Sequence, residues 1–235
     1  MSTPEFSVAE VHEAIAATRP DEVCLVFRDR RLTWAELTDR TRRLANHLIS
    51  QGLGCHTERN QLQGHESGQD HLAIYLHNGN EYLEAMLGSF KARVAPFNVN
   101  YRYVAEELQY LLDDSQATAI VVHSQFSPTL AEVLPNLPRL RVILQVDDGS
   151  GLPLLPGAVW YEEALTAASP DRPAVEWSAD DLYILYTGGT TGMPKGVLWR
   201  NADANVECFG GSNADNLSAI VAEATGGLKA LLAPP

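Results

Sequence analysis

The chain has 235 residues, of which 45% are hydrophobic and 20% are charged, and its formal net charge is −13. This composition is that of an ordinary globular protein, and it excludes the disordered, collagen-like and disulfide-rich classes. The excess of acidic residues repels phosphate backbones, which argues against nucleic-acid binding. No apolar run approaches the roughly 18 residues of a membrane-spanning helix, so we expect no transmembrane segment.

The N-terminal ten residues carry acids where a secretory signal needs basic residues followed by an apolar run. The three cysteines, Cys24, Cys55 and Cys208, are widely spaced and form no CxxC pair, which is typical of reduced thiols. Cys24 lies in an apolar segment, and we expect it to be inert core. These features predict a cytoplasmic protein.

Helices and strands are expected to alternate along most of the chain. Ser7–Glu10 and Thr33–Glu36 each match a capping box, and they predict helices that run to about Pro20 and Gln51. A strand is expected at 23–27, followed by a charged turn at 29–31. Further strands are expected at 71–77, 94–99, 118–123, 140–146 and 182–186, and helices at 81–91, 104–112 and 129–134. This alternation predicts an α/β fold with a parallel, doubly wound sheet flanked by helices.

Residues 55–70 interrupt this alternation with a polar stretch that has no periodicity. Several residues in or beside it could ligate a metal: Cys55, His56, Glu58, His65, Glu66, Asp70, His71 and His77. Their spacing is irregular, whereas structural zinc prefers short paired spacings. The stretch is therefore interpreted as a solvated insertion, and we predict no metal site. A module that binds a metal through this stretch is kept as a third functional hypothesis, behind the two that are given at the end of this section.

Other polar residues are interpreted structurally. His123 ends a predicted strand, where a hydrogen-bonded histidine is favoured over a catalytic base. Tyr101, Arg102 and Tyr103 form a compact polar and aromatic turn, for which a packing role is favoured over direct contact with a substrate. The acids Glu106, Glu107, Asp113 and Asp114 are expected on a solvated helix surface.

The segment from Thr187 to Gly196 is the most informative part of the sequence. It follows an apolar strand and contains four glycines, three threonines, a proline and Lys195. Glycines allow the backbone amides to converge on an anion, and threonine hydroxyls and one lysine add donors and charge. The segment predicts a phosphate-binding loop with these residues: Thr187, Gly188, Gly189, Thr190, Thr191, Gly192 and Lys195.

Two common phosphate loops do not match this segment. A Walker A loop needs the lysine between a glycine and a serine or threonine, but Lys195 lies between Pro194 and Gly196. A Rossmann loop opens a helix, whereas residues 196–199 are β-like. We therefore expect the loop to join two strands.

The sequence TGGTTGMPKG resembles the signature of the adenylate-forming, or AMP-binding, superfamily, with Gly188 in place of the usual serine. Residues 32–37 (LTWAEL) and 87–103 (LGSFKARVAPFNVNYRY) are similar to two further elements of that family. The residues of these segments are most similar to those of actinobacterial long-chain fatty-acid or steroid acyl-CoA ligases. The resemblance covers essentially the whole chain and implies the N-terminal part of the adenylate-forming fold.

The resemblance implies ATP-dependent conversion of a carboxylic acid to an acyl-adenylate and then to an acyl-CoA thioester. ATP with magnesium, CoA and a small-molecule acid would be the partners, and a homo-oligomer is compatible with the sequence. Family elements with a histidine, a magnesium-binding glutamate and a ribose-binding aspartate are missing, as is a small C-terminal lid domain with a catalytic lysine. We therefore expect residues 1–235 to be an N-terminal portion that is inactive alone. The alternative is a non-catalytic nucleotide-binding or interaction module that retains the loop.

Overall fold

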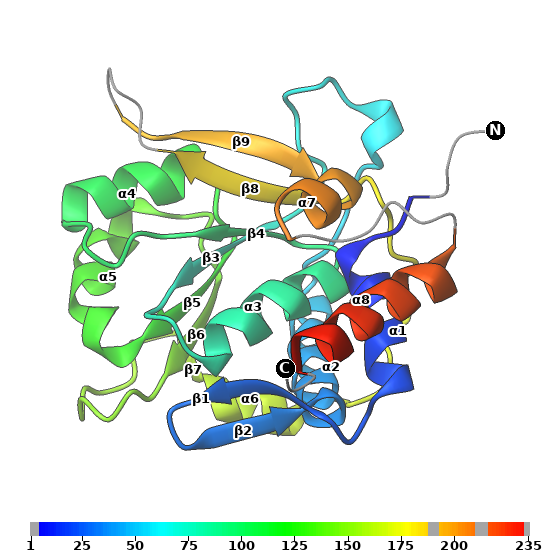
Figure 1. Cartoon of the computed structure of the whole chain (residues 1–235). Helices are drawn as coiled ribbons and strands as arrows, with labels where there is room; N and C mark the ends of the chain where they lie inside the picture. The colour runs from blue at the N-terminus through cyan, green and yellow to red at the C-terminus, as the bar shows by residue number, and fades with distance from the viewer. Residues whose placement is uncertain (1–4, 188–192, 210–215, 233–235) are drawn as a thin grey trace.

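The computed structural model describes residues 5–187, 193–209 and 216–232, with residues 225–232 described by their backbone alone. The strands of its large sheet are β3 (His71–Tyr75), β4 (Ala95–Asn98), β5 (Ala119–His123), β6 (Val142–Val146), β7 (Val159–Trp160), β8 (Leu182–Thr187) and β9 (Lys195–Arg200). Their order is β7-β6-β5-β3-β4-β8-β9 (Figure 1). Neighbouring strands are parallel except for β8 and β9, which are antiparallel. The predicted, mostly parallel sheet is confirmed.

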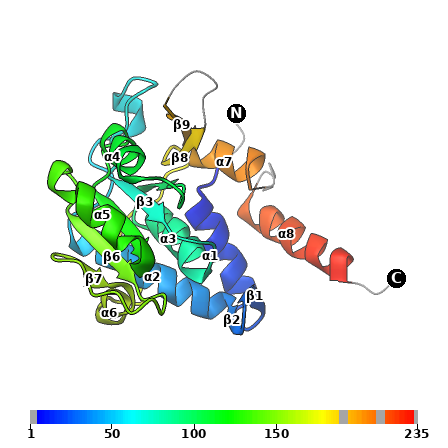
Figure 2. The ribbon, with the colours of Figure 1, turned by 90° about the vertical axis from the view of Figure 1, so that its left-hand side faces the viewer.

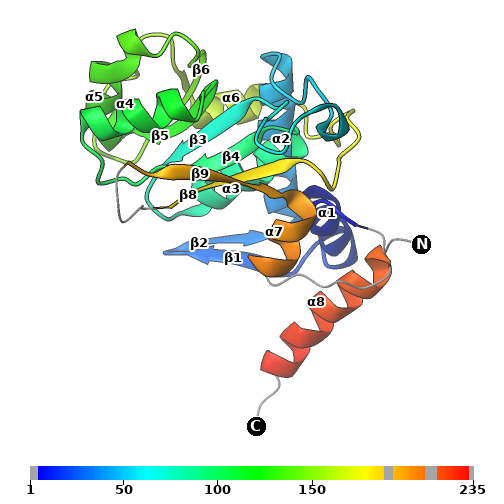
Figure 3. The same cartoon turned by 90° about the horizontal axis from the view of Figure 1, so that it is seen from above.

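Helices cover both faces of this sheet, as Figures 2 and 3 show. One face packs against α2 (Trp34–Ser50), α3 (Asn80–Lys91) and α6 (Tyr161–Ala167). The other face packs against α4 (Ala105–Asp114) and α5 (Ser127–Val133). The sheet is therefore doubly wound, as predicted. No helix in the described ranges combines the length and the apolarity that crossing a membrane requires.

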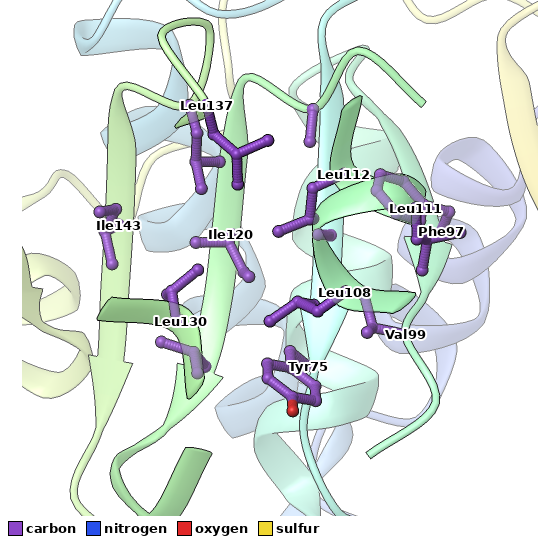
Figure 4. Close-up of a cluster of buried hydrophobic side chains, with 14 of the residues drawn as sticks. Tyr75, Phe97, Val99, Leu108, Leu111, Leu112, Ile120, Leu130, Leu137 and Ile143 are labelled. Carbon is purple, nitrogen blue, oxygen red and sulfur yellow. The ribbon is translucent and has the colours of Figure 1, made fainter. Parts of the chain in front are cut away.

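The core lies on both sides of the sheet because successive strand residues point to opposite faces. In β3, Ala73 and Tyr75 join the cluster under α4 and α5, whereas Leu72 and Ile74 join the cluster under α2 and α3. Figure 4 shows the first of these clusters, in which α4 contributes three leucines. Burial on both faces explains why these strands have continuous apolar sequences.

The N-terminal region adds a helix and a small second sheet, which pack against α3 and the large sheet. Both capping boxes are confirmed: α1 (Val8–Thr18) and α2 begin directly after Ser7 and Thr33, whose hydroxyls accept backbone hydrogen bonds. β1 (Val23–Phe27) pairs with β2 (Arg30–Thr33) in a two-stranded antiparallel sheet. The turn predicted at 29–31 lies at 28–29 instead, because Arg28 takes a φ of 53° and Arg30 and Arg31 already belong to β2.

Several short or unusual elements escaped the sequence analysis. These are β7, α6, α7 (Asn201–Glu207), α8 (Leu217–Leu232) and the 3₁₀ turns η1 (Arg59–Gln61), η2 (Ser124–Phe126) and η3 (Leu134–Asn136). Two residues of β7 and seven of α6 are too few to establish a period. The Gly226–Gly227 pair within α8 has low helix propensity.

Candidate functional site: the β8–β9 hairpin

The glycine-rich segment connects β8 to β9, which confirms the prediction that it joins two strands. Gly188, Gly189, Thr190, Thr191 and Gly192 lie outside the described residues. Of the predicted phosphate-binding residues, the structure therefore locates Thr187 and Lys195. These two residues lie directly opposite each other and form the last pair of the hairpin before the glycine-rich segment.

Thr187 and Lys195 occupy one face of the hairpin, because directly opposite residues of antiparallel strands project to the same side. Both side chains are exposed. No ion pair joins Lys195 to another described residue. A hydroxyl donor and an uncompensated ammonium group therefore lie side by side at the point where the chain enters the glycine-rich segment.

Burial decreases along β8 toward this end of the hairpin. Leu182, Tyr183 and Ile184 are buried in the sheet, the next two residues are half-buried, and Thr187 is exposed. The start of β8 is thus buried in the core, while the end of the hairpin that carries Thr187 and Lys195 is exposed to solvent. An anion could approach this end without displacing core residues.

The root of β8 is fixed by an ionic cluster that sequence reasoning missed. Arg93, which follows α3, contacts the Asp181 carboxylate at 2.8 Å and the Glu58 carboxylate at 2.8 Å. Burial raises the pKa of Asp181, and the Arg93 guanidinium opposes that shift. Gln69 accepts a hydrogen bond from the Leu182 amide at 2.7 Å and donates one to the Arg93 carbonyl at 2.8 Å. The polar insertion at 55–70 is therefore fastened to the base of the hairpin.

An aromatic cluster lies at the carboxyl ends of β3 and β5. The His77 amide donates to Nδ1 of His123 at 3.0 Å, and the His77 ring lies 4.6 Å from that of Tyr101 and 4.9 Å from that of Phe126. Burial lowers the pKa of His123, which keeps its ring neutral and able to accept this bond. His123 thus has the hydrogen-bonded, structural place that the sequence predicted.

The solvated-surface interpretation of the acids on α4 needs one correction. Asp114 accepts a hydrogen bond from the Tyr186 hydroxyl at 2.7 Å, so this carboxylate is tied to β8. Glu107 accepts a hydrogen bond from the Val104 amide at the start of α4. The contact of Asp114 joins positions 72 residues apart, which no local pattern reveals.

The cysteines and the candidate metal ligands have structural surroundings. Cys24 is half-buried, and burial raises the pKa of its thiol to about 11, so the thiol is protonated at neutral pH. His71 is hydrogen-bonded through both ring nitrogens, to the Ser115 carbonyl and to the Ser67 hydroxyl. Within the described ranges, no three His, Cys, Asp or Glu side chains are grouped so that they could hold a metal ion.

Comparison with known proteins adds sequence relatives that cover this hairpin. Residues 12–221 match the family described as AMP-binding enzyme. The medium-chain acyl-CoA ligase Mig of Mycobacterium avium is 53% identical over 242 residues, which cover 100% of this chain and 44% of that protein. A medium/long-chain-fatty-acid–CoA/3-oxocholest-4-en-26-oate–CoA ligase of Mycobacterium tuberculosis is 41% identical over 209 residues, which cover 88% of this chain and 36% of that protein.

Solved structures share the fold. An anthranilate CoA ligase, AuaEII, in complex with anthranoyl-AMP matches with a TM-score of 0.74 at 19% identity, over 86% of this chain and 36% of that one. A fatty acyl CoA synthetase of Mycobacterium tuberculosis matches with a TM-score of 0.66 at 22% identity, over 83% of this chain and 34% of that one. The chain spans 36–44% of the length of the two sequence relatives named above. The two sequence relatives named above are acyl-CoA ligases. On the match across residues 12–221, the chain belongs to the AMP-binding enzyme family.

Proposed function

We propose that the β8–β9 hairpin binds the β- and γ-phosphates of ATP during acyl-adenylate formation. The observation that carries this proposal is the pairing of Thr187 with Lys195 at the mouth of a glycine-rich segment, in a protein of net charge −13. Lys195 is exposed and has no ion pair among the described residues, so its charge is available to a polyphosphate. The threonines and glycines at 188–192, which lie outside the described residues, would complete the loop.

In the proposed reaction, a carboxylate oxygen attacks the α-phosphorus of ATP, and the bond to the bridging oxygen of pyrophosphate breaks. Lys195 would stabilise the negative charge that develops on the departing pyrophosphate, and Thr187 would hold its oxygens by donating a hydrogen bond. The CoA thiol then attacks the acyl carbonyl and releases AMP. Magnesium would travel on the nucleotide phosphates, and we assign no step to it.

We further propose that residues 1–235 correspond to the N-terminal portion of a longer adenylation domain, with 55–70 as a polar insertion. The lengths of the relatives support this proposal, because the chain spans less than half of each. Their names indicate a medium- or long-chain fatty acid or a steroid side-chain acid as the substrate class. The three free cysteines are consistent with a cytoplasmic location.

ATP titration of the purified chain and its Lys195→Ala variant tests the phosphate-binding proposal. A charge-assisted hydrogen bond contributes about 1.5–3 kcal/mol, so the variant should bind ATP about 10- to 150-fold more weakly. Arg31→Ala is the matched control, since it removes one exposed positive charge from β2, which belongs to the other, two-stranded sheet, and should leave the affinity unchanged. Equal affinities of the chain and Lys195→Ala would refute the role of the hairpin.

A further inference from the structure

The helix α4 contacts β8 and the residue that directly precedes β9, next to the proposed phosphate-binding residues. Tyr110 donates a hydrogen bond from its hydroxyl to the carbonyl of Pro194 at 3.2 Å. Tyr186 donates from its hydroxyl to the Asp114 carboxylate at 2.7 Å. Pro194 directly precedes Lys195, and Tyr186 directly precedes Thr187. Each arm of the hairpin is therefore held one residue away from a side chain proposed to bind phosphate.

The two contacts come from one side of α4. Tyr110 and Asp114 are four residues apart, which places them one above the other on the same helix face. Leu108, Leu111 and Leu112 fix that helix on the sheet, because all three are buried in the core beneath it. The views in Figures 1 and 2 agree that α4 lies next to the β8–β9 hairpin. A helix anchored in the core thus provides a rigid support for the exposed end of the hairpin.

The hairpin is shaped to accept this support. Tyr186 and Gly196 are register partners, and a Cβ atom at position 196 would lie 3.0 Å from the Tyr186 ring. Glycine therefore leaves room for the ring on the face opposite to Thr187 and Lys195. Burial, together with the nearby Asp114 carboxylate, raises the pKa of Tyr186, so its hydroxyl stays protonated and donates to Asp114.

We propose that Tyr110 and the Asp114–Tyr186 pair of hydrogen-bonding groups are positioning residues, which hold Thr187 and Lys195 in place for the triphosphate. This inference rests on the proposed function of the hairpin. Neither α4 residue reaches the phosphate side of the hairpin, so both act through the backbone and not by contact with the ligand. Loss of either tether should weaken triphosphate binding without unfolding the protein.

The test is titration of the purified chain and its variants with ATP and with inorganic tripolyphosphate, alongside their thermal unfolding midpoints. Asp114→Ala, Tyr186→Phe and Tyr110→Phe should each weaken binding of both ligands about 5-fold, the equivalent of one hydrogen bond. Asp114→Asn keeps an acceptor oxygen and should bind within about twofold of the unmodified chain. The double variant Asp114→Ala/Tyr186→Phe should bind no more weakly than either single variant, because both changes break the same bond.

The matched control is Asp113→Ala, which removes the same charge from the adjacent, exposed position of α4. Removal of any acid near the hairpin reduces the repulsion of phosphate and raises its affinity. Asp113→Ala measures this charge effect alone, so that the effect of losing the Asp114–Tyr186 hydrogen bond can be told apart from it. Tyr186→Phe and Tyr110→Phe each delete only a hydroxyl group, and they decide the question if Asp114→Ala does not fold.

Two negative results are distinguishable. No Lys195-dependent binding of either ligand by the unmodified chain would overturn both the proposed function and this inference. Lys195-dependent binding that Asp114→Ala, Tyr186→Phe and Tyr110→Phe all leave unchanged would overturn the positioning role alone. The same holds if Asp114→Asn loses as much affinity as Asp114→Ala, because a hydrogen-bond acceptor would then not be the operative feature.

Discussion

His12 on α1 is buried without a hydrogen-bond partner for either ring nitrogen among the described residues. It lines an apolar cavity of about 300 Å³ together with Trp34, Leu37 and Phe90. Burial, reinforced by the nearby charge of Lys91, lowers the pKa of His12 from 6.5 to about 3. Glu13 acts in the opposite direction and Arg42 in the same direction as Lys91, so the ring is held neutral inside a charged neighbourhood.

Because the pKa of His12 is lowered in the folded protein, we expect the free energy of unfolding to fall in mild acid. Between pH 6.5 and about 3 the unfolded chain binds a proton on His12 that the folded chain does not, so the free energy of unfolding falls as the pH falls. The cost attributable to His12 is about 2 kcal/mol at pH 5. His12→Met should remove it, because methionine fills a similar apolar space without titrating.

Urea unfolding of both proteins at pH 7 and pH 5 checks this expectation. The free energy of unfolding of the variant, relative to that of the unmodified chain, should rise by about 2 kcal/mol between pH 7 and pH 5. Other histidines titrate in both proteins, so the difference between them isolates His12. A difference in stability that is the same at the two pH values would contradict the assignment.

At the scale of the elements, Gly88 of α3 lies directly against Leu44 of α2. A Cβ atom added there would lie 2.7 Å from Cδ2 of Leu44, whose side chain is fully buried. Near this crossing, Lys91 is buried with its ammonium 2.5 Å from the Glu13 carboxylate and 2.9 Å from the Thr41 hydroxyl. Tight apolar packing and a satisfied buried charge together fix how α1, α2 and α3 meet.

Gly88→Ala should therefore destabilise the protein by about 1–3 kcal/mol through overpacking, although alanine is the better helix former. Gly64→Ala is the control, because a Cβ atom there meets nothing within 4 Å. Denaturant midpoints of the two variants are the measurement. Gly88→Ala as stable as Gly64→Ala would show that Leu44 and its neighbours can move aside.

The success of sequence reasoning differs between elements for physical reasons. The starts of α1 and α2 follow from local capping boxes, which the sequence displays directly. The strands β3, β5 and β6 were predictable because burial on both faces leaves continuous apolar runs. The role of α4 was not predictable, since Asp114 and Tyr110 meet the hairpin only through contacts between segments more than 70 residues apart. The hairpin itself was predicted from the glycine-rich segment and its β-like continuation.

At the scale of the whole molecule, every described part that supports the hairpin lies within this chain. The start of β8 is buried in the core, and Arg93 holds the Asp181 carboxylate directly before it. Helix α4 holds the exposed end of β8 through the Asp114–Tyr186 hydrogen bond. The phosphate-binding part of the proposed site therefore has its complete support here. The chain spans 36–44% of the length of the two ligases named above, and our proposal places the remaining groups of the adenylating site in the other part of such proteins. We therefore expect residues 1–235 to bind ATP without activating it.

Exchange of labelled pyrophosphate into ATP by the purified 235-residue chain, in the presence of magnesium and a medium-chain fatty acid, tests this central claim most directly. The account predicts no acid-dependent exchange above a blank without protein, under conditions in which the same preparation binds ATP through Lys195. Acid-dependent exchange that disappears in Lys195→Ala would contradict it, because the chain would then contain a complete adenylating site.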